Sequence, residues 1–582
     1  MPSARSFSPL FLLLCVLPGF ALAADFTLEL KGLEGDLRSN VEAQLASLGL
    51  DSITVRGRYR AGVRTGVRDG LKALGYYEPK LTFSWGPVPE AGSKRPRLLS
   101  LTVDPGEPVR IAGADLVLKG EAAEDPDFRA LLKDLPEKGR VLHHGEYEAF
   151  KKRVQSVAMK KGYFQGRFTK TELAVATSLH EAWWRLEYDS GRRWHFGPVR
   201  FTGSQIDEGI LQNLVPFRTG DPYASESLAE LNENLADTGW FNSAVVAPDF
   251  RAVNDDMEVP MVGSVTPRSG NIVETGVGYS TDVGPRFKGE WTKPWVNRRG
   301  HSLTLSTNVS AKEQEFDFSY KMPRPASPLE QYYLVQGGWK RTSLNDTDSS
   351  QTTLVASRYW NLETGWQRAV NLRWMLDSFT QGESDATTMV IYPGVSFNRT
   401  RSRGGSMPTW GDSQRYTFDV SRTEWGSDID FWSFYAQGAI IRTAAARHRF
   451  IGRYAFGWIQ STNFKAVPPD LRFFAGGDRS IRGYDYKSIS PRDASGELRG
   501  AERLLTASLE YQWNMKGSWW TAVFVDAGEA VERFTSTSFK TGAGVGIRWQ
   551  SPVGPVKLDV ARPVGDPDHT GFAFYIGLGP EL

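Results

Sequence analysis

Cysteine is almost absent from this chain of 582 residues, which contains a single copy, Cys15. Net charge is also nearly absent, because 69 Lys and Arg are balanced by 67 Asp and Glu. Such a balance gives the chain no general affinity for nucleic acid. No stretch of 18 or more apolar residues follows residue 23. The rest of the chain is therefore either soluble or crosses a membrane as a β-barrel, whose strands each carry a weak hydropathy signal.

Catalytic motifs are absent as well. The sequence contains no P-loop, no Gly-x-Ser-x-Gly nucleophile elbow and no His-Glu-x-x-His zinc motif. Its seven histidines are scattered, and the adjacent His143 and His144 lack the spacing of metal ligands. We therefore expect no enzymatic activity, no cofactor and no metal.

The N-terminus has the composition of an export signal. Arg5 supplies the positive charge, the apolar segment reads LFLLLCVLPGF, and Ala21 and Ala23 are the small residues of a cleavage site. Cys15 lies inside the apolar segment and lacks a small residue before it, so we expect no lipid anchor and no thiol in the mature chain. The sequence predicts a signal peptide over residues 1–23.

Glycine and aromatic residues are plentiful, which indicates many turns and strands. Between residues 24 and 267 a pattern recurs three times: a helix-like segment ends in glycine, aromatic residues follow, and a strand closes the unit. Gly75, Gly162 and Gly239 occupy the position where a helix ends in the left-handed conformation. The pattern predicts three small α+β domains, at 24–112, 113–191 and 192–267. One irregular α+β domain is the alternative.

From about residue 268 onward, apolar and polar residues alternate with period two, as in the segments QEFDFSY, RYTFDV, TASLEYQW, GAGVGIRW and VKLDV. A soluble β-sandwich would also alternate. However, one face is aromatic near the strand ends and the other carries charges in strand after strand, which suits a lipid-facing girdle and a wet lumen. We predict an all-β transmembrane barrel of about 16 antiparallel strands over residues 268–582.

One connection in the barrel half, residues 460–500, is much longer than the others and contains the stretch GGDRSIRGYDY. Loops of this length are usually functional or disordered. Its aromatic content suits a loop folded inside the lumen better than a solvated tether.

The segment SIRGYDY resembles the VRGY/F motif of the outer-membrane assembly-barrel superfamily, which contains BamA, TamA and the two-partner secretion transporters. Isoleucine replaces the usual valine of the motif, whose residues here are Ile481, Arg482, Gly483 and Tyr484. The resemblance implies that Arg482 pairs with a Phe-x-Asp-x-Gly motif on the inner barrel wall. The segment FVDAG supplies that motif through Phe524, Asp526 and Gly528. Arginine suits this task because it is always charged and grips a carboxylate through two bonds.

The resemblance extends over nearly the whole chain after the signal peptide. The three N-terminal units resemble polypeptide-transport-associated (POTRA) domains, and their number favours the TamA type. This implies a barrel in the outer membrane of a Gram-negative bacterium, with POTRA domains in the periplasm. The implied partners are an inner-membrane-anchored TamB-like subunit, unfolded outer-membrane proteins or autotransporter clients, and the lipid bilayer, but no nucleic acid.

A closed barrel must pair its first strand, near residues 271–279, with its last, near residues 570–578. Glycine weakens a strand, and glycines occur in both segments, so we expect only a few hydrogen bonds at this seam. The residues expected at the seam are Gly276, Gly278, Phe572, Phe574, Gly577 and Gly579. We hypothesise that the seam opens laterally and templates client strands. The alternatives are a two-partner-type polypeptide secretion pore and a general BamA-like insertase.

Overall fold

The computed structural model describes residues 26–50, 53, 55–87, 96–280, 284–362, 364–534, 539–552 and 554–578. The predicted signal peptide and Gly579 lie outside these residues. The chain forms two compact units. The first contains the chain up to Gly197 with Thr219–Glu226 and Ala252–Val259, and the second contains the remainder, including the barrel. No helix in the described part of the chain has the length and hydrophobicity needed to cross a bilayer.

The N-terminal half contains three small sheets with one topology. Their strand orders are β1-β3-β2, β4-β6-β5 and β7-β9-β8, so the last strand of each sheet along the chain lies in its centre. In the first two sheets, one outer strand is parallel to the central strand and the other is antiparallel. These sheets and their helices confirm the predicted α+β architecture. Strand β4 begins at Arg110, so the expected boundary at residue 112 falls inside this strand.

The strands of these three sheets and the helices between them follow one another along the chain as β1 (Phe26–Lys31), α1 (Gly35–Ser47), α2 (Arg56–Ala73), β2 (Lys80–Trp85), β3 (Arg97–Asp104), β4 (Arg110–Lys119), α3 (Pro126–Leu131), α4 (His144–Lys160), β5 (Arg167–Ala176), β6 (Glu181–Asp189), β7 (His195–Thr202), α5 (Glu208–Gln212), α6 (Ser225–Asp237), β8 (Phe241–Pro248) and β9 (Glu258–Pro267).

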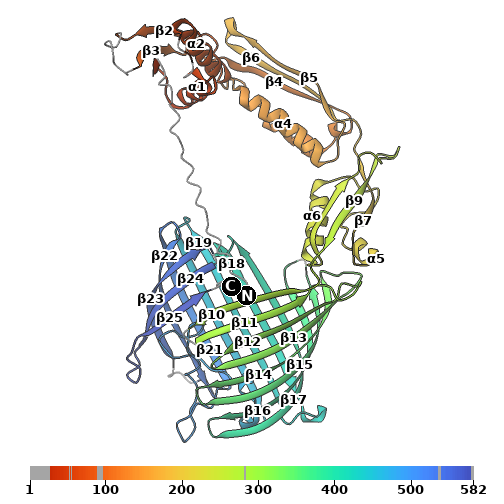
Figure 1. Ribbon diagram of the computed structural model, residues 1–582, viewed down its shortest axis with the longest axis vertical. Coiled ribbons are helices and arrows are strands. Elements are labelled where there is room, and N and C mark those ends of the chain that lie inside the picture. Colours follow the sequence, from red (N-terminus) through yellow and green to blue (C-terminus); the bar gives the residue numbers. More distant parts are fainter. Residues whose placement is uncertain are drawn as a thin grey trace, which may run out of the picture. The chain divides into compact units, whose positions relative to one another are not determined.

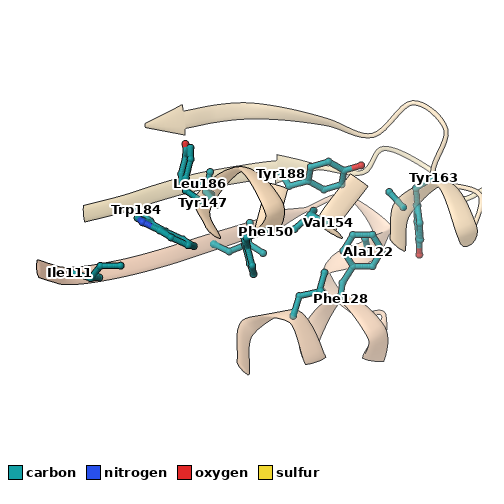
Figure 2. Packing of buried hydrophobic residues seen from close by; sticks show 13 residues of the cluster. Ile111, Ala122, Phe128, Tyr147, Phe150, Val154, Tyr163, Trp184, Leu186 and Tyr188 are labelled. Atoms are coloured by element: carbon teal, nitrogen blue, oxygen red, sulfur yellow. The ribbon is translucent and has the colours of Figure 1, made fainter. Parts of the chain in front are cut away.

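Helix α4 shows how the sequence builds these domains. Its buried residues Tyr147, Phe150, Val154 and Ala158 recur at helical spacing and so form one face. That face packs on β6, where the ring centroid of Trp184 lies 5.3 Å from that of Tyr147 in an edge-on arrangement (Figure 2). Burying a large apolar side chain contributes about 1.5–3 kcal/mol, so this face holds the helix against its sheet.

The joints between successive domains repeat one hydrogen-bond pattern. After α2, the carbonyl of Gly75 accepts a bond from the Val109 amide, and the Val109 carbonyl accepts one from the Leu142 amide. After α4, Gly162 and Trp194 accept the equivalent bonds, from the amides of Trp194 and Tyr223 respectively. Gly75 and Gly162 have φ values of 91° and 83°, in the left-handed region that favours glycine. The glycine that ends each long helix therefore also fixes the next domain.

The barrel is a sheet of sixteen antiparallel strands in chain order, from β10 to β25 (Figure 1). This arrangement confirms the predicted barrel. Its strands are β10 (Ile272–Ser280), β11 (Gly284–Lys293), β12 (Ser302–Ser310), β13 (Glu313–Pro323), β14 (Gln331–Leu344), β15 (Thr347–Asn361), β16 (Gln367–Gln381), β17 (Ser384–Arg403), β18 (Trp410–Ser421), β19 (Phe431–Ala444), β20 (His448–Ser461), β21 (Arg503–Lys516), β22 (Trp519–Val531), β23 (Lys540–Ser551), β24 (Gly554–Val564) and β25 (Ala573–Leu578).

The two faces of the barrel wall follow the period-two pattern of the sequence. On β22, Ala522, Phe524 and Asp526 are buried on the inner face, whereas Val523 and Val525 are about half exposed on the outer face. Successive side chains of a strand point to opposite faces. Asp526 therefore lies in the lumen, whereas Val523 and Val525 face lipid.

Candidate functional site in the lumen and at the seam

The long connection between β20 and β21 folds back into the lumen of the barrel. Its tip carries Ile481 and Tyr484, which are buried in an apolar cluster with Ala475, Ala501 and Leu504. Because Leu504 belongs to β21, this cluster fixes the loop to the barrel wall. The burial of Ile481 and Tyr484 aims the intervening Arg482 at the inner face of β21–β24.

Arg482 is 1% exposed and binds the wall through most of its guanidinium donors. Its Nε and Nη2 donate to the two carboxylate oxygens of Asp526 at 2.7 and 2.9 Å, and its backbone amide donates to the same carboxylate at 3.1 Å. Its guanidinium carbon lies 3.3 Å from the ring centroid of Phe524. The structure thus brings together Arg482, Phe524 and Asp526, as the motif resemblance implied.

The ion pair belongs to a larger buried cluster. Arg482 Nη1 also donates to Glu510 at 2.8 Å and to Asp559 at 3.2 Å. Arg548 donates to the same two carboxylates, with its Nη2 2.7 Å from Glu510. Arg453 approaches Glu510 to 3.9 Å. Three arginines and three carboxylates, on the loop and on the five strands β20–β24, therefore balance their charges away from water, which buried ion pairs require.

Glycines let the loop backbone lie directly against the wall. Gly483 has a φ of 102°, and a β-carbon there would lie 2.8 Å from the carbonyl carbon of Arg562 on β24. A β-carbon at Gly542 on β23 would collide with the carbonyl oxygen of Arg482. Gly528 lies against the neighbouring strand, because a β-carbon there would collide with the carbonyl oxygen of Leu505 on β21.

Tyr575 links the loop tip to the last strand of the barrel. The Gly483 amide donates to the Tyr575 hydroxyl at 2.9 Å, and that hydroxyl donates to the Tyr484 carbonyl at 2.9 Å. The Tyr484 hydroxyl in turn donates to Asp566, in the turn before β25, at 3.1 Å. The motif therefore holds all of β21–β25 from the lumen side, up to the edge of the sheet.

The seam lies between β10 and β25, which are the two end strands of the sheet order and lie close together (Figure 1). Among the described residues, no hydrogen-bonded ladder joins them. Gly276 and Gly278 lie on β10, where a β-carbon at Gly276 would meet no atom within 4 Å. Phe574 and Gly577 lie on β25. Both end strands therefore present a backbone edge that no described strand covers.

Strand β25 is shorter than the sequence predicts. It begins at Ala573, so Phe572 lies before the strand and outside the ladder. The ladder with β24 ends at the pair Ala561 and Ala573. Two residues beyond Ala561 on β24 is Pro563, which has no amide hydrogen to donate to a longer β25. Within the described residues, six residue pairs therefore hold the last strand, whereas eleven join β23 to β24.

Among the described residues, no group of His, Cys, Asp and Glu side chains is arranged to hold a metal ion. The carboxylates of the lumen cluster are instead occupied by arginines. The ion pairs of this cluster hold the loop between β20 and β21 against the barrel wall.

Comparison with known proteins decides the family. The Omp85 superfamily domain matches residues 269–581, which is more than half of the chain. This chain belongs to the Omp85 superfamily. Residues 27–105 match the description "POTRA domain TamA domain 1", and residues 195–268 match a POTRA family described as "Surface antigen variable number repeat". The Omp85 barrel lies in the outer membrane and its POTRA domains lie in the periplasm.

Three similar proteins share 14–26% sequence identity with this Omp85 chain. The outer membrane protein assembly factor BamA of Nitratidesulfovibrio vulgaris is 26% identical over 396 residues, which cover 64% of this chain and 49% of that protein. The chain thus spans about half the length of this curated relative. The structure of Haemophilus ducreyi BamA lacking POTRA domains 1–3 has a TM-score of 0.67 at 15% identity, covering 81% of this chain and 99% of that one. CdiB from Escherichia coli has a TM-score of 0.45 at 14% identity, covering 94% and 98%.

Several site residues of this Omp85 barrel were missed by sequence reasoning. Glu510, Arg548 and Asp559 complete the lumen cluster, Gly542 admits the loop backbone, and Tyr575 joins the loop to β25. The alternation of apolar and polar residues places all five on the inner face of the wall, and this was the only sign in the sequence that they could reach the loop. Their position around the barrel, and so their distance from the loop, depends on strand register.

Proposed function

We propose that this chain inserts client proteins into the outer membrane by opening the seam between β10 and β25. The Omp85 superfamily consists of barrels that insert or secrete proteins, and the observation that favours insertion is the unpaired edge at this seam. A backbone group left unpaired in hydrocarbon costs several kcal/mol. A client strand that pairs with β10 or β25 relieves that cost, so pairing and burial of the client supply the free energy without a nucleotide.

The lumen cluster has a supporting role in this proposal. The hydrogen bonds of Tyr575 to the loop hold β25 in place from inside while its outer edge stays free. Arg482 holds the loop to β21–β24 at the same time. The seam would then open by movement of β10 away from a fixed C-terminal wall, which keeps one template edge ordered.

A groove in the first POTRA domain supports a role for this domain in receiving peptide. It has a volume of about 540 Å³ and lies beside β1, the outer strand of its sheet, and α1. Leu28, Leu30 and Leu45 supply an apolar lining, and Arg38 and Glu42 a polar one. An outer strand next to an apolar groove suits addition of a further strand, in which main-chain hydrogen bonds give affinity for many sequences.

The finer assignment is to the TamA type. It is supported by the match of residues 27–105 to "POTRA domain TamA domain 1" and by three POTRA-like sheets. On this assignment the clients are of the autotransporter type, and the periplasmic domains contact an inner-membrane-anchored TamB-like subunit. Depleting the protein and recording which outer-membrane proteins disappear tests the assignment. A loss spread over most outer-membrane barrels would favour a general BamA-like insertase instead.

A secretion pore is the second candidate function. A polypeptide that crossed the lumen would have to displace the loop whose tip carries Arg482, which is held by the buried cluster. The observed packing therefore favours a route along the seam. Steady ion conductance through the purified wild-type protein would contradict this preference.

A disulfide across the seam is the decisive experiment. The only cysteine is Cys15, inside the predicted signal peptide, so engineered pairs have no background thiol in the mature chain. Gly276→Cys combined with cysteine at each position of β25 in turn should give at least one variant that crosslinks when oxidised. Client assembly in that variant should stop on oxidation and return on reduction.

The matched control for this experiment is a crosslink within the wall. Lys288 and Asn308 face each other across β11 and β12, so cysteines at these two positions lock a pair that is already joined. Oxidation of this control should leave client assembly unchanged. Full assembly with the seam itself locked would refute lateral opening.

A further inference from the structure

The outer wall of the barrel carries an arginine patch at one end, formed by Arg368 on β16, Arg399, Arg401 and Arg403 on β17, and Arg442 on β19. The three arginines on β17 lie at alternate positions that continue from Val395 and Phe397, so they point to the same face of the strand. Val395 and Phe397 are about 40% exposed on the outer face. Register places Arg368 opposite Phe397, and both Arg403 and Arg442 opposite Trp410. All five therefore face outward, within the four consecutive strands β16–β19.

The patch lies at the periplasmic end of the barrel. Strand β10 follows directly after the third POTRA sheet, so its first residue is at that end. Antiparallel strands alternate in direction, which places the β17–β18 turn, residues 404–409, at the periplasmic end as well. Arg399, Arg401 and Arg403 precede this turn on β17. Arg368 lies at the start of β16 and Arg442 near the end of β19, which are at the same end of the barrel.

The patch begins where the lipid-facing band ends. On β17 the outward residues run from Met389 to Phe397 without a charge, over about 26 Å of strand. For a strand tilted by about 40° this covers about 20 Å of height, most of the band of about 25 Å that a barrel presents to lipid. Arg399 is the next outward residue, and Arg442 likewise follows the exposed Ile440 on β19. The guanidinium groups are thus at the level of lipid head groups.

Carboxylates cannot neutralise this patch. Asp412 is the one carboxylate that contacts it among the described residues, with Arg401 at 2.8 Å, Arg399 at 3.6 Å and Arg442 at 4.0 Å. Within the same described part, Arg368 and Arg403 have no salt-bridge partner. Five positive charges therefore face one negative charge.

Aromatic side chains hold these arginines in place. The guanidinium carbons of Arg401, Arg403 and Arg442 lie 5.4, 5.3 and 4.7 Å from the ring centroid of Trp410. That of Arg399 lies 4.5 Å from the ring centroid of Trp366. Tryptophan favours the membrane interface, and stacking on it fixes the plane of a guanidinium. The guanidinium groups are pre-positioned, although Asp412 balances only one of the five positive charges.

We propose that this patch binds the phosphate groups of anionic phospholipids in the periplasm-facing leaflet of the membrane. Planar guanidinium forks match phosphate oxygens in two-bond contacts. In the described part of the chain, the opposite end of the same wall shows no such excess, since Asp348 and Asp385 lie on the outward face there and Asp348 pairs with Arg341. The patch is therefore a local lipid site, independent of what the seam does.

The test uses the purified full-length protein in a neutral detergent. Its thermal unfolding is recorded with dioleoylphosphatidylglycerol, with dioleoylphosphatidylcholine, and with inorganic phosphate at the same concentration. The variant is R368Q/R403Q, because these two arginines have no carboxylate partner and their loss should not unfold the barrel. The control is R341Q/R422Q, which makes the same change of charge at the other end.

Phosphatidylglycerol should raise the wild-type midpoint, and the other two additions should not. An arginine near an anionic surface changes affinity about fivefold, so R368Q/R403Q should bind phosphatidylglycerol at least tenfold more weakly. The control variant should bind within twofold of wild type. Unchanged binding by R368Q/R403Q, an equal loss in the control, or equal stabilisation by inorganic phosphate would each overturn the proposal. Heat-modified mobility on a gel establishes that both variants are folded.

Discussion

Neutralising Arg482 and Asp526 separately and together measures how the lumen loop is held. Asp526 is fully buried, and Arg482 is the only cation within salt-bridge distance of it among the described residues. Arg482→Gln therefore leaves a buried carboxylate without a cation, which should cost about 3–5 kcal/mol of folding free energy. Asp526→Asn should cost less, about 1–3 kcal/mol, because Arg482 keeps Glu510 and Asp559 as partners.

The double variant Arg482→Gln/Asp526→Asn tests whether the two residues stabilise each other. Without Arg482 and the Asp526 charge, the cluster retains Arg453 and Arg548 against Glu510 and Asp559, so its charges still balance. The two changes together should therefore cost at least about 1 kcal/mol less than the sum of the single changes, as expected for residues in contact.

Urea unfolding of the full chain in detergent, followed by tryptophan fluorescence, measures these free energies. The control cycle combines Arg482→Gln with Asp419→Asn, whose partner is Arg373 elsewhere in the lumen. Distant changes should add to within about 0.5 kcal/mol. Strict additivity for Arg482 and Asp526 as well would refute the claim that the pair anchors the loop.

Three further results are expected. Gly542→Ala should lower the free energy of unfolding by about 1–3 kcal/mol, because its β-carbon forces the loop off the wall. Gly452→Ala should be far milder, since its β-carbon would meet only one side-chain atom, at 3.8 Å. Thermal unfolding compares the two variants, and equal losses of stability would contradict this expectation. Tyr575→Phe removes two hydrogen bonds to the loop, so amide exchange in β25 should accelerate severalfold while β12 stays unchanged. His144 follows the first joint at the start of α4, and its Nε2 lies 2.6 Å from the hydroxyl of Tyr77, close after Gly75. Burial, with a smaller effect of nearby positive charges, lowers the pKa of His144. Its folded pKa thus lies below that of the unfolded chain, so its stabilising effect is complete above about pH 6.5 and is lost as the pH falls below that value. Amide exchange at the joint should therefore quicken between pH 7.5 and 5.5 in the wild type but less so in His144→Gln; identical pH profiles would argue against this assignment.

Periodicity explains how much of the fold was predictable. Alternating residues identify a strand and its two faces, and the left-handed glycines after helices mark the POTRA-like domains, because both are local properties of the chain. The barrel and the α+β sheets therefore follow from sequence. The pairing of Arg482 with Asp526 came instead from the motif resemblance, since about forty residues separate them.

Register explains what the sequence could not supply. Glu510 and Asp559 lie on the inner face, as do Arg415 and Asp419, yet only the first two reach the loop. Parity places all four in the lumen, but strand stagger around the barrel decides which of them meet. The early end of the β24 ladder was missed for a similar reason. The alternation around Phe572 continues beyond the hydrogen bonds, so hydropathy overstates the length of β25.

The repeated joint of the N-terminal domains has a consequence for how such chains lengthen. At each joint, one residue of the next domain, Val109 or Trp194, links Gly75 or Gly162 to that domain through two backbone hydrogen bonds. Because backbone atoms make these bonds, the joint tolerates changes in the linking side chain, which is valine in one case and tryptophan in the other. Duplicating or deleting one unit of about eighty residues would recreate the same joint at the cut. Modules can therefore be gained or lost in evolution without a new interface having to arise.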